Sequence, residues 1–131
     1  SDRPKLLMMM DYWMFTPLHT AASRGNTESV KAILNSLQSS DRLKLLMMRA
    51  FRQHTPLHIA ASEGHTESVK ALLNSLTADQ QMQLLIVEDK YGKTAVEMAS
   101  GETADVLSEY KNRAREKADP GEFIPLNSHV M

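Results

Sequence analysis

The chain has 131 residues, of which 24% are charged, and a formal net charge of −1. This length predicts one domain, and the balanced charge argues against nucleic acid or an anionic membrane as a partner. Cysteine is absent, which excludes disulfides, thiolate metal sites and cysteine nucleophiles. The sequence has no signal peptide and no apolar run of about 18 residues, so we expect a cytoplasmic or recombinant protein, not a secreted one.

The chain opens with a fractional repeat followed by an apolar segment. "SDRPKLL" (1–7) matches "SDRLKLL" (40–46), so residues 1–7 correspond to the end of a preceding unit. Residues 8–15 then read MMMDYWMF and contain the only tryptophan of the chain. Such a segment is unexpected here, because a connecting turn is normally polar.

Residues 16–37 and 55–76 are two copies of one unit, offset by 39 residues. Eighteen of their 22 positions are identical, and the differences are Thr20/Ile59, Arg24/Glu63, Asn26/His65 and Ile33/Leu72. A third, degraded copy begins at Thr94. We predict a single domain made of repeats at about 8–46, 47–85 and 86–118, with a C-terminal tail at 119–131.

Each unit begins with a short helix. Thr55 is a suitable N-cap, and Pro56 stands at the first helical position, where its missing N–H costs nothing. Ala60 and Ala61 give this helix a slim packing side, and Gly64 ends it.

A second helix follows, which we expect Thr66 to cap. Its apolar stripe has the spacing i, i+3, i+4 and i+7, formed by Val69, Leu72, Leu73 and Leu76. Thr77 and Gln80 then resemble a capping box, which predicts a brief extra helix that extends through Leu85.

"TPLHTAASRGNTESVKAILNSL", "TPLHIAASEGHTESVKALLNSL" and the turn "EDKYGKT" resemble ankyrin repeats. The resemblance implies an all-α solenoid of stacked helix-turn-helix units with hairpin tips. It also implies macromolecular binding without catalysis or cofactor, and a structural hydrogen-bonding role for His19 and His58. Two features depart from the family pattern. The unit has 39 residues where 33 are usual, and the copy at Thr94 lacks the Pro-Leu-His sequence, which fits a degenerate C-terminal capping repeat.

The three hairpin tips, residues 8–15, 47–54 and 86–93, diverge far more than the helices. Only two of eight positions agree between the first and second tips. Gly92 of the third tip is expected at positive φ, and Met14 and Gln53 replace it in the others. A non-glycine residue there costs on the order of 1 kcal/mol, which suggests that something other than folding chose these residues.

Aromatic residues, methionine and arginine are enriched at protein interfaces, which makes the tips and the neighbouring concave helix face the candidate partner-binding surface. The candidate residues are Met9, Met10, Tyr12, Trp13, Met14, Phe15, Thr20, Arg24, Arg49, Phe51, Arg52, His54 and Ile59. An alternative for the methionine pairs 8–9 and 47–48 is a place in the core, because both align with Ile86 and Val87.

The sequence favours a non-catalytic scaffold, engineered to bind a folded protein with an apolar groove. Two alternatives stay open: a symmetric homodimer assembled through the same patch, and a fragment of a natural ankyrin-repeat adaptor or effector. The five histidines form no i, i+4 pair on a helix, and we expect no metal, no nucleic acid and no membrane as a partner.

Overall fold

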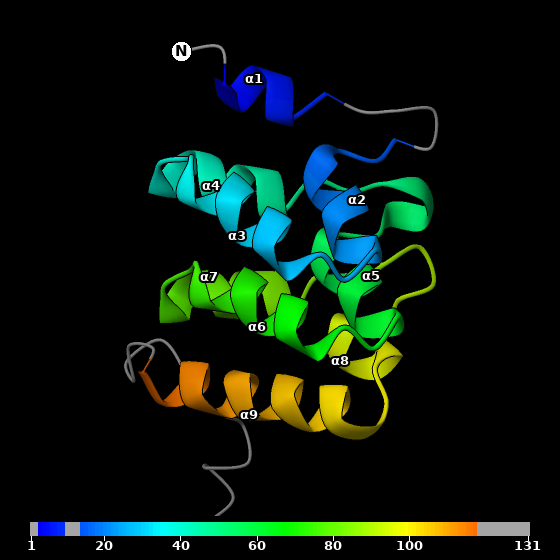
Figure 1. The fold of residues 1–131 in the computed structure, drawn as a ribbon. Helices are drawn as coiled ribbons and strands as arrows, with labels where there is room; N and C mark the ends of the chain where they lie inside the picture. Colours follow the sequence, from blue (N-terminus) through cyan, green and yellow to red (C-terminus); the bar gives the residue numbers. More distant parts are fainter. Residues whose placement is uncertain (1–2, 10–13, 118–131) are drawn as a thin grey trace, which may run out of the picture.

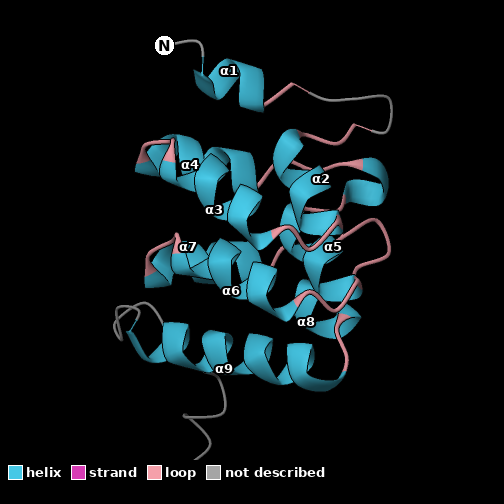
Figure 2. Cartoon of the chain, in the orientation of Figure 1, coloured by secondary structure: helices cyan, strands magenta, loops and turns pink. Residues whose placement is uncertain are grey.

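The computed structural model describes residues 3–9 and 14–117, which form a stack of helices (Figures 1 and 2). The helices are α1 (Arg3–Leu7), α2 (Pro17–Ser23), α3 (Thr27–Asn35), α4 (Ser39–Leu46), α5 (Pro56–Ser62), α6 (Thr66–Asn74), α7 (Ala78–Leu85), α8 (Ala95–Met98) and α9 (Gly101–Lys117). A 3-10 turn, η1 (Phe51–Gln53), precedes α5. The predicted all-α solenoid is confirmed, and none of the described residues forms a strand.

The helices lie in rows that run through the stack (Figure 1). An inner row contains α2, α5 and α8, and an outer row contains α3, α6 and α9, with each helix packed on the next. The short helices α4 and α7 form a third row, and α1 lies beyond α4 at the end of the stack. One unit cannot bury its own apolar face, so each unit depends on its neighbours.

The first two inner helices begin with a threonine and a histidine that cap each other. The hydroxyls of Thr16 and Thr55 accept hydrogen bonds from the backbone N–H of His19 and His58, at 3.3 and 3.2 Å. In return, each histidine Nδ1 accepts the threonine N–H at 3.2 Å. This is a capping box in which histidine replaces the usual Glu or Gln, and the predicted N-cap at Thr55 is confirmed.

The extra helix predicted after position 77 is α7. The Thr77 hydroxyl accepts from the N–H of Gln80 at 3.2 Å, and the Gln80 side chain accepts from the N–H of Thr77 at 3.1 Å. In the preceding repeat, α4 begins after Gln38, whose side chain makes no capping hydrogen bond. The longer repeat therefore contains a third helix, and only one of the two copies has a capping box.

The prediction that Thr66 caps α6 is wrong. His65 holds the cap position, and Thr66 is the first residue of the helix. The Thr66 hydroxyl instead lies 2.7 Å from that of Thr103 in the next repeat, just as Thr27 lies 3.1 Å from Ser68. These threonines therefore link repeats and do not cap their helices.

His65 also connects two repeats. Its Nε2 donates to the Ser23 carbonyl at 3.0 Å, and its ring lies against Gly25. A Cβ at Gly25 would lie only 2.6 Å from the His65 Nδ1, so glycine is required there by space as well as by its φ of 66°. The difference Asn26/His65 between the two copies therefore has a packing consequence.

The core is the continuous aliphatic cluster between the helix rows. The predicted stripe of α6 is buried throughout, from Val69 to Leu76.

Arg42 links two repeats at the edge of this core. Its guanidinium donates to the carbonyls of Leu34, Leu37 and Ser75 at 3.1, 2.9 and 3.1 Å, which ties the end of α3 to the end of α6.

The third repeat closes the stack. Its inner helix α8 has only four residues, and a single 17-residue helix, α9, packs on both α6 and α7. This is the degenerate capping repeat expected from the sequence. The predicted tail at 119–131 lies outside the described residues.

Candidate protein-binding surface

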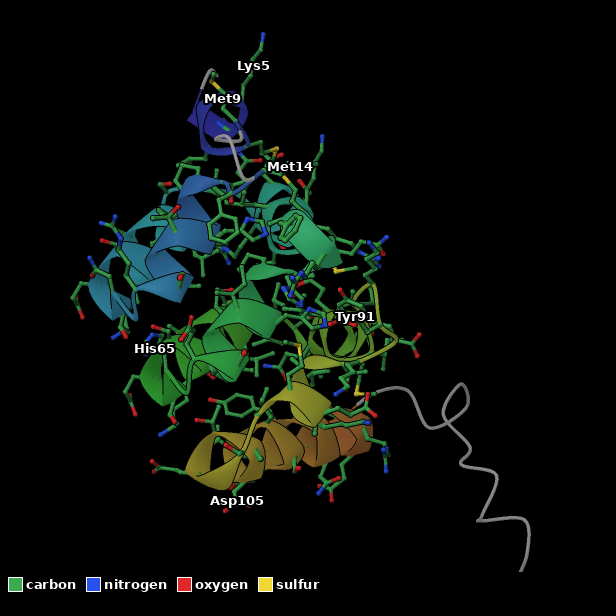
Figure 3. The ribbon with its side chains drawn as sticks, turned by 90° about the vertical axis from the view of Figure 1, so that its right-hand side faces the viewer. Lys5, Met9, Met14, His65, Tyr91 and Asp105 are labelled. Carbon is green, nitrogen blue, oxygen red and sulfur yellow. The ribbon has the colours of Figure 1, made fainter. Side chains whose placement is uncertain are left out.

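The third tip is a turn organised by one carboxylate. The Asp89 Oδ1 accepts from the backbone N–H of Tyr91 at 2.8 Å and of Lys93 at 2.9 Å. Gly92 has a φ of 80°, which confirms the predicted left-handed position. Hydrogen bonds to Asp89 therefore hold the backbone of this turn, and its side chains project from the edge of the stack (Figure 3).

The other tips adopt the left-handed conformation without glycine. Met14 has a φ of 65° and Gln53 a φ of 62°, as the alignment with Gly92 predicts. Arg52 also has a φ of 62°, which the alignment did not indicate. Each such residue costs roughly 1–2 kcal/mol relative to a right-handed conformation. The strain is located at the tips, where functional strain is commonly found.

Histidines connect the inner helices to the tips. Because Nδ1 of His19 and His58 accepts a backbone N–H, Nε2 must carry the proton. The His58 Nε2 donates to the Lys93 carbonyl at 2.9 Å, and the His19 Nε2 lies 3.1 Å from the carbonyls of both Met48 and His54. The structural role that the resemblance implied for these two histidines is thereby confirmed.

Two groups near the third tip have shifted pKa values. Burial lowers the pKa of His58 below 6.5, and the neighbouring His54 adds to this effect against the opposing hydrogen bond to Lys93. Burial by itself would raise the pKa of Asp89, but hydrogen bonds from Lys93, Tyr91 and His54 outweigh it and hold this pKa below 3.8. Asp89 is therefore an ionised acceptor at neutral pH, and His58 is neutral.

Large apolar side chains are exposed on all three tips. The exposed fractions are 62% for Met9, 51% for Met14 and 51% for Phe51. Tyr91 of the third tip is 61% exposed, although it was not among the predicted partner-binding residues. The sequence did contain a signal for this exposure, because an aromatic residue stands within the turn sequence Asp-Lys-Tyr-Gly. Figure 3 shows Met14 and Tyr91 along the same edge of the stack.

Two candidate residues of the second tip are arginines. Arg49 donates to the Gln53 side chain at 3.2 Å, and the Arg52 guanidinium lies 5.2 Å from the centre of the Phe51 ring. Both arginines are exposed, while His54 is half-buried and its ring stacks on His58 at 5.6 Å. The second tip thus presents a cation beside an apolar ring.

The remaining described candidates lie nearer the helices. Phe15 is half-buried and stacks on His19 at 5.6 Å. Thr20 and Arg24 line a cleft of about 560 Å³ together with Met9 and Phe15. Ile59 is only 8% exposed, so its side chain offers little surface to a partner.

The methionine pairs differ in exposure. Met8, Met47 and Met48 are half-buried and pack against the core, whereas Met9 is exposed. Three of these four side chains therefore lie at the edge of the core. The candidates Met10, Tyr12 and Trp13 lie outside the described residues.

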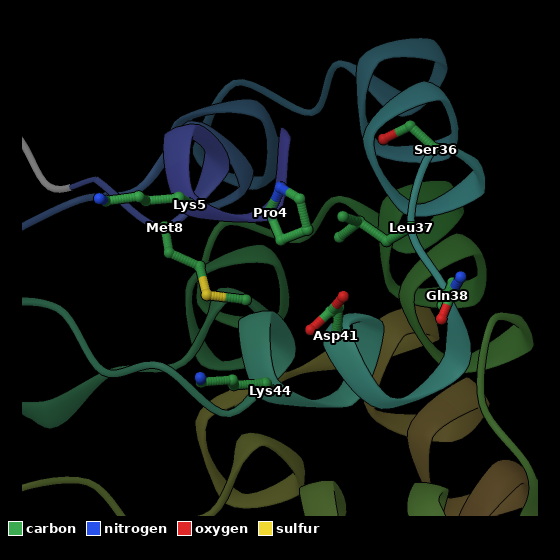
Figure 4. Close-up of a pocket in the computed structure, with 8 residues that line it drawn as sticks. All are labelled: Pro4, Lys5, Met8, Ser36, Leu37, Gln38, Asp41 and Lys44. Carbon is green, nitrogen blue, oxygen red and sulfur yellow. The ribbon is translucent and has the colours of Figure 1, made fainter. Parts of the chain in front are cut away.

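A larger cleft of about 800 Å³ opens between α1 and the corner that joins α3 to α4 (Figure 4). Its lining residues are Pro4, Lys5, Met8, Ser36, Leu37, Gln38, Asp41 and Lys44. The Ser36 hydroxyl donates to the Ile33 carbonyl at 2.7 Å.

Within 3–9 and 14–117, no three His, Asp or Glu side chains are grouped so that they could hold a metal ion. Over this part of the chain, every helix is too short or too polar to cross a bilayer.

Comparison with known proteins agrees with the stacked helix pairs and their Thr-Pro-Leu-His caps. The family model described as ankyrin repeats, in three copies, matches residues 18–117. The chain belongs to the ankyrin repeat family. Ankyrin repeats generally mediate protein–protein interactions, and they are typically non-catalytic binding modules. A search of curated proteins returned no match.

Proposed function

We propose that this ankyrin-repeat chain is a non-catalytic scaffold that binds a folded protein through its hairpin tips and the adjoining concave face. The observation that carries the proposal is the set of exposed apolar side chains on the tips, Met14, Phe51 and Tyr91. The first two tips also keep non-glycine residues at positive φ. Exposed apolar surface and retained strain both have a cost for the isolated fold, and a partner that covers the tips would explain why both persist.

The contrast between the tips and the helices supports the same proposal. Helices that agree at eighteen of 22 positions carry tips that agree at two of eight. Such a pattern is expected when tips are chosen for a partner on a fixed scaffold, whether by engineering or by natural selection. Fully burying one large apolar side chain contributes roughly 1.5–3 kcal/mol, so a few of them can hold a micromolar complex.

The test is a selection of binders from a displayed library of folded domains, followed by affinity measurements on variants. We expect Phe51→Ala to weaken selected binders by at least about tenfold, as is usual for a central aromatic residue. The control is Tyr110→Phe on α9, which removes a hydroxyl that bonds Asn74 but leaves the tips intact. Binders that are insensitive to Phe51→Ala would contradict the proposal.

Light scattering across a dilution series tests whether the partner is a second copy of the chain. A monomer from high micromolar to nanomolar concentration fits a foreign partner. A dimer that dissociates on dilution and is lost in Phe51→Ala would assign the same surface to self-association instead.

A further inference from the structure

The second and third tips form one continuous surface. The backbone N–H of Lys90 donates to the Arg52 carbonyl at 3.0 Å. The His54 Nε2 donates to the Asp89 Oδ2 at 3.1 Å. Because these two contacts fix one tip against the other, a ligand that touches both meets a preorganised site and loses less entropy on binding.

This surface is cationic, although the whole chain carries a net charge of −1. The second and third tips contain four basic residues, Arg49, Arg52, Lys90 and Lys93, and all four are exposed. Asp89 is buried beneath His54, which leaves Glu88 as the exposed carboxylate of these two tips. A partner with matching charge must therefore be acidic.

Every tip has at least one exposed large apolar side chain: Met9 and Met14 on the first, Phe51 on the second, and Ile86 and Tyr91 on the third. We take Met14, Phe51 and Tyr91 as the apolar anchors of the three tips. Neighbouring helices pack roughly 8–10 Å apart, so consecutive tips repeat at about that distance. Residues i and i+7 of an α-helix lie about 10.5 Å apart on nearly the same face. A strand repeats one face at about 6.6 or 13 Å, which fits the tips less well.

We propose that the tips bind an acidic amphipathic helix of a partner protein. Its apolar stripe lies across the three anchors, and its flanking carboxylates lie over the cations of the second and third tips. This inference rests on the proposed function, because it names the partner for the same tips.

The experiment uses a phage-displayed library of helical peptides of about 20 residues, long enough to span three tips. The library is selected separately on the full chain, on a tip variant (Arg49→Glu with Lys90→Glu) and on a control variant (Arg115→Glu with Lys117→Glu). The control makes the same change of charge at the C-terminal end of α9, on the opposite side of the stack from the tips (Figure 1).

We expect the full chain and the control to enrich peptides rich in Asp and Glu around an apolar i, i+7 stripe. The tip variant should lose this enrichment, and an acidic peptide should bind it at least about tenfold more weakly, with a smaller dependence on salt. Apolar peptides enriched without acidic residues would overturn the inference and leave the proposed function standing. Enrichment that survives Phe51→Ala with Tyr91→Ala, or no enrichment at all, would overturn both.

Discussion

The tips keep non-glycine residues in a backbone conformation that glycine adopts more easily. Gln53 is the clearest case, because it stands where the third tip has Gly92 and its φ is 62°. Its side chain accepts one hydrogen bond from the exposed Arg49, and an exposed contact of this kind contributes little to folding. Stability alone therefore does not explain glutamine at this position.

We predict that Gln53→Gly raises the free energy of unfolding by about 0.5–1 kcal/mol. Relief of the left-handed strain should outweigh the greater unfolded-state entropy of glycine. Chemical denaturation measures the change. The matched control is Gln83→Gly in α7, where φ is helical and the same substitution should destabilise by about 1 kcal/mol. If both variants lose stability, the left-handed position carries no strain.

His58 is expected to make stability sensitive to mild acid. Its pKa is lowered below 6.5 in the folded state, so the unfolded chain binds this proton more readily than the folded one. The contribution is complete above pH 6.5 and is lost as the pH falls from 6.5 through the folded pKa. Asp89, whose pKa is lowered below 3.8, adds a second loss only at pH values below 3.8.

We predict that stability falls between pH 7 and pH 5, and that this slope is smaller in His58→Gln. The variant should also be less stable at pH 7, because the Lys93 carbonyl loses its donor. Thermal unfolding of both proteins at a series of pH values measures the two slopes. Equal slopes would show that another group controls the response to acid.

At the scale of the helices, α4 and α7 are equivalent helices of two repeats that differ in their N-cap residue. Gln38 and Thr77 have similar extended backbone angles, with ψ of 162° and 168°, but only Thr77 makes the side-chain cap. The backbone before α4 is thus already suited to a threonine. Asp41 also stands at the third helical position, where a carboxylate is favourable.

We predict that Gln38→Thr stabilises the chain by about 0.5–1 kcal/mol and that Thr77→Ala destabilises it by about 1 kcal/mol. The first variant adds an acceptor for an unpaired helix N–H, and the second removes one. Urea denaturation measures both changes, with Thr77→Ser as a control that keeps the hydroxyl and should change little. A stabilising Thr77→Ala would contradict the assigned cap.

The elements that could be predicted are those specified by local sequence. The Thr55 cap, the apolar stripe of α6 and the extra helix α7 each depend on residues within one turn or one helix face, so the sequence predicts them. Contacts between repeats depend on distances that the sequence does not contain. This is why the link from Thr66 to Thr103 and the three hydrogen bonds of Arg42 could not be predicted.

The candidate surface could be predicted only in part, because some of its features depend on contacts between repeats. Alignment identified the left-handed positions of Met14 and Gln53, since Gly92 marks the turn. It did not reveal the left-handed φ of Arg52, in a tip that has Ala50 where the third tip has the organising Asp89. The burial of Ile59 depends on its neighbours in the stack, which no single repeat specifies.

Over the whole molecule, stability is expected to be highest in the middle of the stack. Helices α5 and α6 have neighbours on both sides, whereas α1 and α9 lie at the ends (Figure 1). We predict that amide hydrogen exchange is slowest in α5 and α6 and fastest in α1, which has only five residues. Native-state exchange read by mass spectrometry measures this order, and slower exchange in α1 than in α5 would contradict it.

The claim that the tips bind the partner is tested most directly by hydrogen exchange on a complex with a selected binder. We expect new protection in the hairpin tips, at residues 8–15, 47–54 and 86–93, with little change in α4, α7 and the outer side of α9. Protection confined to α4, α7 or α9, with the tips exchanging as in the free chain, would contradict it.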